Sequence, residues 1–148
     1  MSIFDYNGSC VVAMAGENCV AIASDTRLGS NQLQTVTGSF PKCFRMGSKS
    51  FVGLTGLATD IQTVHETLKF KKNLFELRQE REMSPHALAS QISSLLYGRR
   101  FGPYFVGPVV AGLNESNEPY LAAFDLLGAG CMAKDFVVNG TTSEQLYG

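Results

Sequence analysis

The sequence predicts an α+β fold in which sheets and helices form separate layers. Runs with the pattern of β-strands come first, two helical segments follow one another, and further strand-like runs come after them. Because the helices are grouped and do not alternate with the strands, this order favours antiparallel sheets over a parallel β-α-β arrangement. The chain has 148 residues, 45% of them hydrophobic and 17% charged, so we expect residues 1–148 to form a single domain with a sizeable core.

The first two strands are expected in a hairpin formed by residues 8–27. Two runs of small apolar residues flank Gly16-Glu17-Asn18, where glycine and asparagine tolerate the positive φ of a short turn. Small residues such as Ala21 and Ala23 predict that the hairpin packs closely between layers. The second strand ends abruptly at residues 24–27, and a carboxylate and a guanidinium there need partners. This end is therefore a candidate site, and the alternative is a charged surface cap on a strand.

The first helix is predicted over residues 60–80, with Thr59 or Asp60 accepting its first free N–H groups. Ser84-Pro85 is typical of a second helix start, because proline loses no hydrogen bond in the first turn. Gly98 suits the end of that helix. The apolar faces are expected at Ile61, Val64, Leu68 and Phe75 with Leu74 and Leu77 beside them, and at Leu88, Ile92, Leu95 and Leu96.

The other elements follow from turn residues and short apolar runs, with Thr55-Gly56 marking a sharp turn from strand to helix. They are a polar excursion at residues 28–39 with a short strand at 34–37, a second hairpin formed by residues 41–46 and 50–55, strands at residues 106–113, 120–126 and 136–139, a loop at residues 128–130, and the start of a third helix at residue 142.

Composition argues against several function classes. A net charge of −1 supplies no basic field for nucleic acid or a membrane surface. No apolar run approaches the roughly 20 residues of a membrane helix. We find no metal-ligand cluster, phosphate loop or Gly-x-Ser-x-Gly elbow, so no cofactor or metal is expected. The four cysteines show no CxxC spacing and no signal peptide precedes them, which favours free thiols in a reducing compartment. His65 and His86 are expected to be solvated or to cap helices.

Several stretches resemble β-type subunits of the 20S proteasome, which belong to the N-terminal-nucleophile hydrolases. The first two are the hairpin with its Asp25-Thr26-Arg27 end and the run at residues 51–60. Others are similar to a class of these subunits that has no catalytic threonine. They are residues 1–3 with 6–8, 100–104, 108–113, 135–138 and 144–148. Together the matching stretches cover essentially the whole chain in order.

The resemblance implies a four-layer α-β-β-α sandwich, with two antiparallel sheets between helical layers. It also implies a place in a stacked-ring hetero-oligomer with other α and β subunits, in cytoplasm and nucleus. In the family a third helix completes one outer layer and more strands follow, whereas this chain ends at Gly148. We therefore expect a chain truncated at its C-terminus, either a fragment or isoform, or one whose outer layer comes from elsewhere.

The resemblance also carries the family's active-site positions onto this chain. Active members attack peptides with an N-terminal threonine released by self-cleavage after glycine; its free α-amino group acts as the base. The nucleophile position falls on Ser9, directly behind Gly8. The aspartate and the lysine that tune the site fall on Asp25 and Lys42. Gly56 matches the glycine whose N–H faces the scissile carbonyl.

Three features predict that these positions are not catalytic. Residues 1–8 keep Ser9 from being N-terminal, so no α-amine is available as a base. Asn139 stands where active members carry a serine, and the last two residues of the active constellation lie beyond Gly148. The sequence thus predicts a non-catalytic structural subunit. The alternatives are an active hydrolase that uses Ser9 after cleavage at Gly8, and a truncated orphan paralog that is not incorporated.

Overall fold

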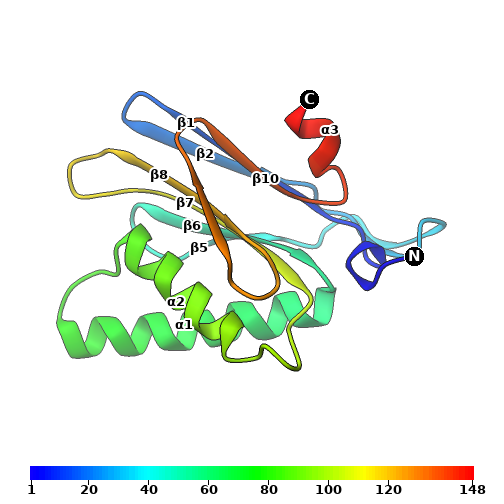
Figure 1. The fold of residues 1–148 in the computed structure, drawn as a ribbon, viewed down its shortest axis with the longest axis horizontal. Helices are drawn as coiled ribbons and strands as arrows, with labels where there is room; N and C mark the ends of the chain where they lie inside the picture. The colour runs from blue at the N-terminus through cyan, green and yellow to red at the C-terminus, as the bar shows by residue number, and fades with distance from the viewer.

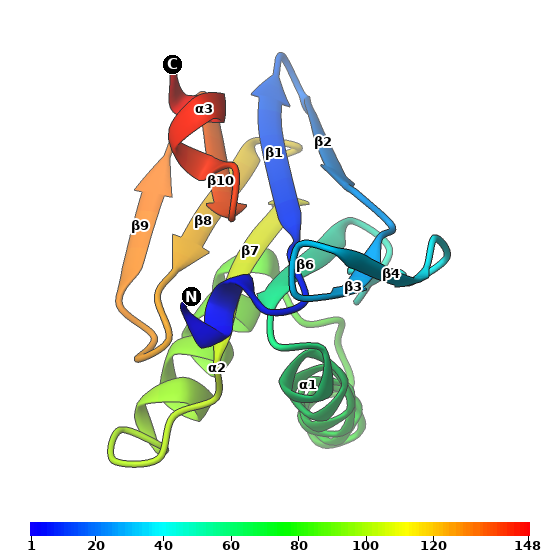
Figure 2. The same cartoon turned by 90° about the vertical axis from the view of Figure 1, so that its right-hand side faces the viewer.

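The computed structural model describes residues 1–148, which fold into stacked layers of sheets and helices (Figures 1 and 2). The elements in chain order are η1 (Ile3–Asp5), β1 (Cys10–Gly16), β2 (Cys19–Ser24), β3 (Leu28–Ser30), β4 (Gln34–Thr37), β5 (Cys43–Arg45), β6 (Ser50–Gly56), α1 (Ala58–Gln79), α2 (Pro85–Tyr97), β7 (Val106–Leu113), β8 (Pro119–Phe124), β9 (Gly130–Ala133), β10 (Phe136–Gly140) and α3 (Ser143–Tyr147). Neither α1 nor any shorter helix combines the length and the apolar character needed to cross a bilayer.

Two antiparallel sheets form the centre of the molecule. The outer sheet has the order β10-β1-β2, the central sheet has the order β5-β6-β7-β8-β9, and β3 and β4 form a separate ribbon. In Figure 2 the outer sheet lies above the central sheet, and α1 and α2 lie below it. On the opposite side the short α3 packs against β10, where the Tyr147 and Phe136 rings are 5.7 Å apart. The predicted α-β-β-α layering is confirmed.

The predicted first hairpin forms, but its buried face differs from the prediction. Glu17 and Asn18 make the turn, and Asn18 adopts the positive φ of 56° that such a turn requires. Ala21 and Ala23 were expected between layers and are exposed. The register explains the difference, because Ala21 lies opposite Met14, and directly paired residues point to the same face of a sheet.

The two sheets are held together by small and β-branched side chains. The two sheets approach so closely that a Cβ at Gly53 would lie 2.4 Å from a methyl carbon of Val11. Only glycine fits at this position of β6. The buried residues between the sheets are Val11, Ala13, Val109, Ala111, Leu121 and Val137.

The helices cover the other face of the central sheet, as their predicted apolar stripes require. Leu77 is an exception, because the 3.6-residue period places it on the side of α1 away from Ile61, and it is exposed. The core on this side includes Leu54, Ile61, Val64, Leu68, Leu88, Ile92, Leu96 and Val110. The start of α2 is confirmed, with the Ser84 hydroxyl accepting a hydrogen bond from the Ala87 N–H at 3.2 Å.

Two short strands were missed by the sequence analysis. β3 lies in the predicted polar excursion and pairs with β4. β9 begins inside the predicted Gly128-Ala129-Gly130 loop and pairs with β8. The strand β8 ends earlier than expected because the Asp125 carboxylate accepts hydrogen bonds from the Leu127 and Ala129 N–H groups and closes a tight turn.

His65 is only partly solvated, whereas the sequence analysis expected a solvated or helix-capping side chain. Its ring stacks on that of Phe44, with centroids 3.8 Å apart and planes 14° from parallel. The stacking covers part of the imidazole and joins α1 to β5. Burial, assisted by the nearby Lys69 charge, holds the pKa of His65 below its ordinary value of 6.5.

We expect the free energy of unfolding to fall as the pH drops below about 6.5, because the unfolded chain then binds a proton at His65 more readily than the folded protein does. His65→Gln should flatten this part of the pH dependence, measured by urea denaturation at a series of pH values. His86→Gln, on the exposed side of α2, is the matched control. An unchanged slope in His65→Gln would contradict the assignment.

The register of the hairpin predicts a large loss of stability on enlarging one alanine and almost none on enlarging another. Ala13→Phe forces a ring between the sheets and should lower the free energy of unfolding by about 1–3 kcal/mol or more. Ala21→Phe lies on the exposed face of the neighbouring strand and should change it by no more than about 0.5 kcal/mol. Urea unfolding followed by circular dichroism measures both. Equal losses would show that the exposed face is assigned wrongly.

Candidate functional site

A buried lysine lies where the ends of several elements meet. Lys42, just before β5, is only 2% exposed. Its Nζ lies 2.8 Å from Asp25 Oδ2 and donates hydrogen bonds to the carbonyl oxygens of Arg27 at 2.7 Å and Gly8 at 3.5 Å. These three acceptors match the three N–H donors of an ammonium group. Burial of the charge is thereby compensated within the chain.

Asp25 connects this lysine to the outer sheet. Its Oδ1 accepts a hydrogen bond from the Cys10 N–H at 2.9 Å, and its own N–H donates to the Cys10 carbonyl at 3.4 Å. The side chain thus continues the β1–β2 ladder one step beyond the last strand residue. Asp25 stays 38% exposed, so one side of the ion pair faces solvent.

Ser9 and Gly56 are in direct contact beside the lysine. Ser9 is 3% exposed, and its Oγ accepts a hydrogen bond from the Gly56 N–H at 3.0 Å. Gly56 has a φ of 114°, and a Cβ there would lie 2.1 Å from the Phe105 carbonyl oxygen, so only glycine fits. No hydrogen bond joins Ser9 Oγ to Lys42 Nζ. The four positions carried over from the resemblance therefore lie together, but the hydroxyl has no basic partner.

Asn7 holds the segment before Ser9 against the rest of the fold. Its Oδ1 accepts a hydrogen bond from the Ala58 N–H at 2.8 Å, and its Nδ2 donates to the Gly29 carbonyl at 2.9 Å. The predicted cap from Thr59 or Asp60 is wrong: α1 has no capping side chain of its own. An asparagine followed by glycine is a common turn signal, but the sequence did not indicate a partner so far along the chain.

Asn139 takes part in a contact between the two sheets. Its Nδ2 donates to the Phe124 carbonyl at 3.0 Å, and its Oδ1 lies 3.5 Å from the Thr55 hydroxyl, which can donate to it. Gly107 leaves room for the amide, because a Cβ at that position would lie 2.5 Å from Asn139 Oδ1. The amide therefore serves as a polar link between β10 and the central sheet.

Comparison with known proteins places the chain in a family. A model of the family described as proteasome subunit matches residues 6–148. The chain belongs to the proteasome subunit family. It is 58% identical over 148 residues to the proteasome subunit beta type-3 of Oryza sativa subsp. japonica, and 54% identical over 148 residues to the probable proteasome subunit beta type-3 of Schizosaccharomyces pombe. It is 54% identical over 149 residues to the proteasome subunit beta type-3 of Drosophila melanogaster.

Each of these matches covers 100% of this chain and 72% of the relative. The resemblance found in the sequence is thereby confirmed. Proteasome subunits act within a multi-subunit complex, so the surface of this chain is to be considered together with partner surfaces. No group of three or more histidine, cysteine, aspartate or glutamate side chains is placed to hold a metal ion.

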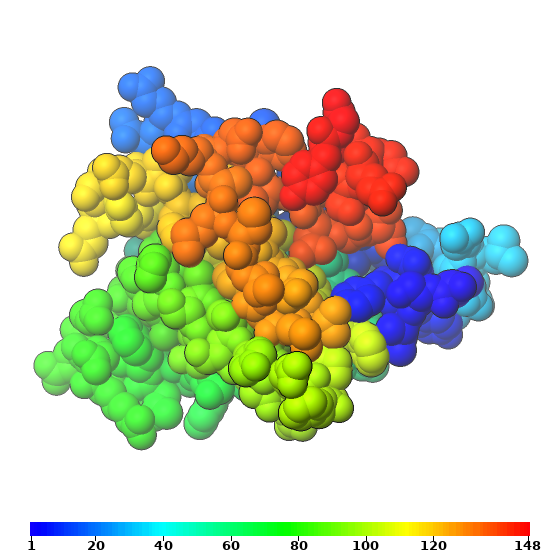
Figure 3. Space-filling view, in the orientation of Figure 1, coloured from blue at the N-terminus to red at the C-terminus, as the bar shows by residue number.

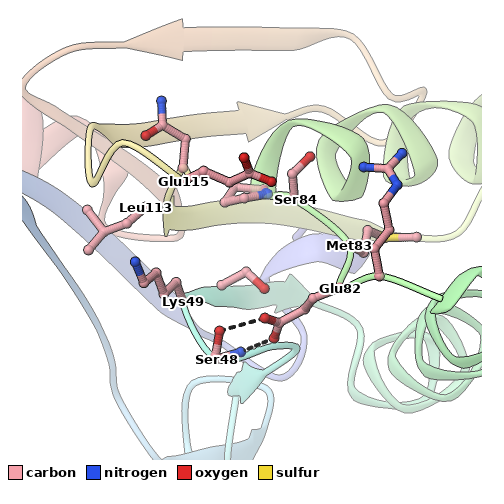
Figure 4. A pocket seen from close by; sticks show the side chains of 11 residues that line it. Ser48, Lys49, Glu82, Met83, Ser84, Leu113 and Glu115 are labelled. Carbon is pink, nitrogen blue, oxygen red and sulfur yellow. Dashed lines mark hydrogen bonds between the residues drawn. The ribbon is translucent and has the colours of Figure 1, made fainter. Parts of the chain in front are cut away.

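A second polar feature of this proteasome subunit lies at the opposite end of β6, in a hollow beside the turn between β5 and β6 (Figure 4). The Glu82 carboxylate accepts hydrogen bonds from the Ser48 N–H and, at 2.6 Å, from the Ser48 hydroxyl. These bonds hold the pKa of Glu82 below its usual range. Lys49 donates to Asn117 at 2.6 Å. The contacts fix the turn between β5 and β6 against the loop that follows α1 and against the loop between β7 and β8.

Replacement of the buried lysine should destabilise the subunit. Lys42→Ala leaves Asp25 without its cation and two carbonyl oxygens without a donor, so we expect a loss of about 2–4 kcal/mol in the free energy of unfolding. The estimate stays below the full cost of breaking a buried pair because Asp25 is partly exposed. Lys134→Ala, at an exposed lysine between β9 and β10, is the control and should change little. Equal urea midpoints for the two variants would contradict a stabilising role of Lys42.

Proposed function

We propose that this proteasome subunit is a non-catalytic structural subunit of the 20S core particle. Residues 1–148 act as one domain that occupies a place in the seven-membered β ring, contacts neighbouring β subunits and the α ring, and helps to wall the proteolytic chamber. The compartments are the cytoplasm and the nucleus. The names of the similar proteins and the family match support this assignment.

The bonding of the Ser9 nitrogen and hydroxyl is the main support for the proposal that the subunit is inactive. An N-terminal nucleophile needs its own free α-amine as base, and the nitrogen of Ser9 is joined to Gly8 in a peptide bond. The hydroxyl is buried and accepts the Gly56 N–H, so this donor is not directed toward a substrate carbonyl. Lys42 Nζ is directed to Asp25 and two carbonyl oxygens. No group of the cluster is therefore placed to remove the hydroxyl proton.

The contacts of Asn7 also support retention of the segment before Ser9. The side chain bridges Gly29 and the first N–H of α1, and Phe4 packs edge-on against Phe105 with centroids 5.9 Å apart. Residues before Ser9 are thus part of the folded structure. The alternative, an active hydrolase, requires cleavage after Gly8 and the loss of these contacts.

Intact-protein mass spectrometry of the assembled complex tests the proposal. We expect a mass that includes residues 1–8, and no covalent label on Ser9 after treatment with an electrophilic peptide inhibitor. Ser9→Ala should leave the peptide hydrolysis of the complex unchanged, because the hydroxyl attacks nothing. A species that begins at Ser9, or a label on it, would favour the active hydrolase.

Assembly is the second part of the same test. The tagged chain should co-migrate with a ring-sized complex on a native gel, and its partners there should be other proteasome subunits. A labelled catalytic subunit in the same sample serves as the positive control for the inhibitor. A chain found only outside ring-sized material would support the orphan paralog and contradict the structural role.

A further inference from the structure

The segment between α2 and β7 carries an unusual concentration of exposed aromatic and cationic side chains. We call residues 97–104 the aromatic loop. Phe101 is 92% exposed and Tyr97 is 60% exposed, and Arg99 and Arg100 lie between them in the chain. In Figure 3 the loop, coloured yellow-green, forms a protrusion at the lower edge of the molecule. The Phe101 ring is therefore almost fully open to solvent.

The aromatic loop is held in one shape by its own backbone. The N–H groups of Gly98, Arg99 and Arg100 donate to carbonyl oxygens of the last turns of α2, at 3.1 Å in each case. Gly102 donates to the Arg99 carbonyl at 3.0 Å. Just after the loop, the Phe105 N–H donates to the Asp60 carboxylate at 2.8 Å. A loop fixed at both ends can present its side chains to a partner with little further loss of entropy.

The two arginines have aromatic partners but no acidic ones. Arg100 Cζ lies 4.8 Å from the centroid of Phe101, and Arg99 Cζ lies 5.5 Å from that of Tyr104. Neither guanidinium forms an ion pair within the chain, where the two ion pairs are Lys42–Asp25 and Lys72–Glu76. A guanidinium that lies over an aromatic ring still has N–H donors with which it can bind a carboxylate.

We infer that the aromatic loop is a docking surface for a neighbouring subunit of the complex. That neighbour presents an apolar pocket, which takes Phe101, with carboxylates at its rim that bind Arg99 and Arg100. The inference deepens the proposed function and rests on it. Aromatic and arginine side chains are the residue types that most often dominate binding energy at protein interfaces.

Charge and shape favour a protein partner over a nucleic acid. Residues 97–104 hold two arginines and no acidic residue, while the whole chain has a net charge of −1. Two isolated cations do not provide the extended basic stripe that tracks a phosphate backbone. A rigid phenyl ring that projects into solvent is complementary to a concave apolar surface, and the flanking cations select acidic groups around it.

A photo-crosslinker tests the identity of the partner. Benzoylphenylalanine at position 101 of the tagged full chain, expressed in cells that assemble the complex, should form one dominant crosslink within ring-sized material. We expect the crosslinked peptide to belong to a single neighbouring proteasome subunit and to contain aspartate or glutamate. A crosslink to nucleic acid, or to a peptide without carboxylates, would overturn the inference.

Incorporation of point variants provides the second measurement. Phe101→Ala and Arg100→Ala should each lower the fraction of the chain in ring-sized complexes by about tenfold or more, as expected for hot-spot residues. Phe70→Ala, at a phenylalanine of α1 that is 66% exposed, is the matched control and should incorporate normally. Urea midpoints of the isolated variants should equal that of the wild type, which separates a docking defect from a folding defect.

The outcomes distinguish this inference from the function on which it rests. If the wild type enters the ring-sized complex and Phe101→Ala enters it equally well, the docking surface is wrong and the structural role stands. If the wild type itself is absent from the complex, the proposed function fails and the docking surface fails with it.

Discussion

The ammonium group of Lys42 is the point on which the arrangement of the sheets depends. A buried cation is tolerated only when its donors are satisfied, and here the acceptors come from two segments of the chain, both distant in sequence from the lysine. One follows β2, one precedes β1, and the lysine itself precedes β5. Since each segment must stay in place for the charge to be compensated, one side chain determines how the outer sheet meets the central sheet at this edge.

Close packing between the two sheets imposes a second constraint. Gly53 and Ala13 keep the interface thin, so the polar groups at its edge come within hydrogen-bonding reach of one another. The contact between Ser9 and Gly56 requires this short separation, and so does the amide of Asn139 across from Gly107. The residues of the cluster are therefore held by the same thin interface that holds the fold together.

The sequence predicted the parts of the structure that rest on periodicity and local turn chemistry. The apolar stripes of the helices and the Ser84 cap were of this kind. The family resemblance assigned Ser9 and Lys42 to one site, although they are far apart in the chain. The first hairpin carries alanine on both of its faces. Because neighbouring residues are equally small and apolar, the alternating pattern of a strand could not show which face is buried. The cap from Asn7 on α1 was also beyond local rules, since its two partners are brought near only by the folded sheets.

The position of Asn7 has a consequence for cleavage of the chain before Ser9. The same side chain that precedes the Gly8–Ser9 bond also supplies the acceptor for the first N–H of α1. Cleavage of this bond would separate Asn7 from the rest of the chain, and the first N–H of α1 would then depend on a detached segment for its acceptor. A variant that released a free serine here would therefore also need a new acceptor at the helix terminus, so cleavage at this bond and the stability of α1 are coupled.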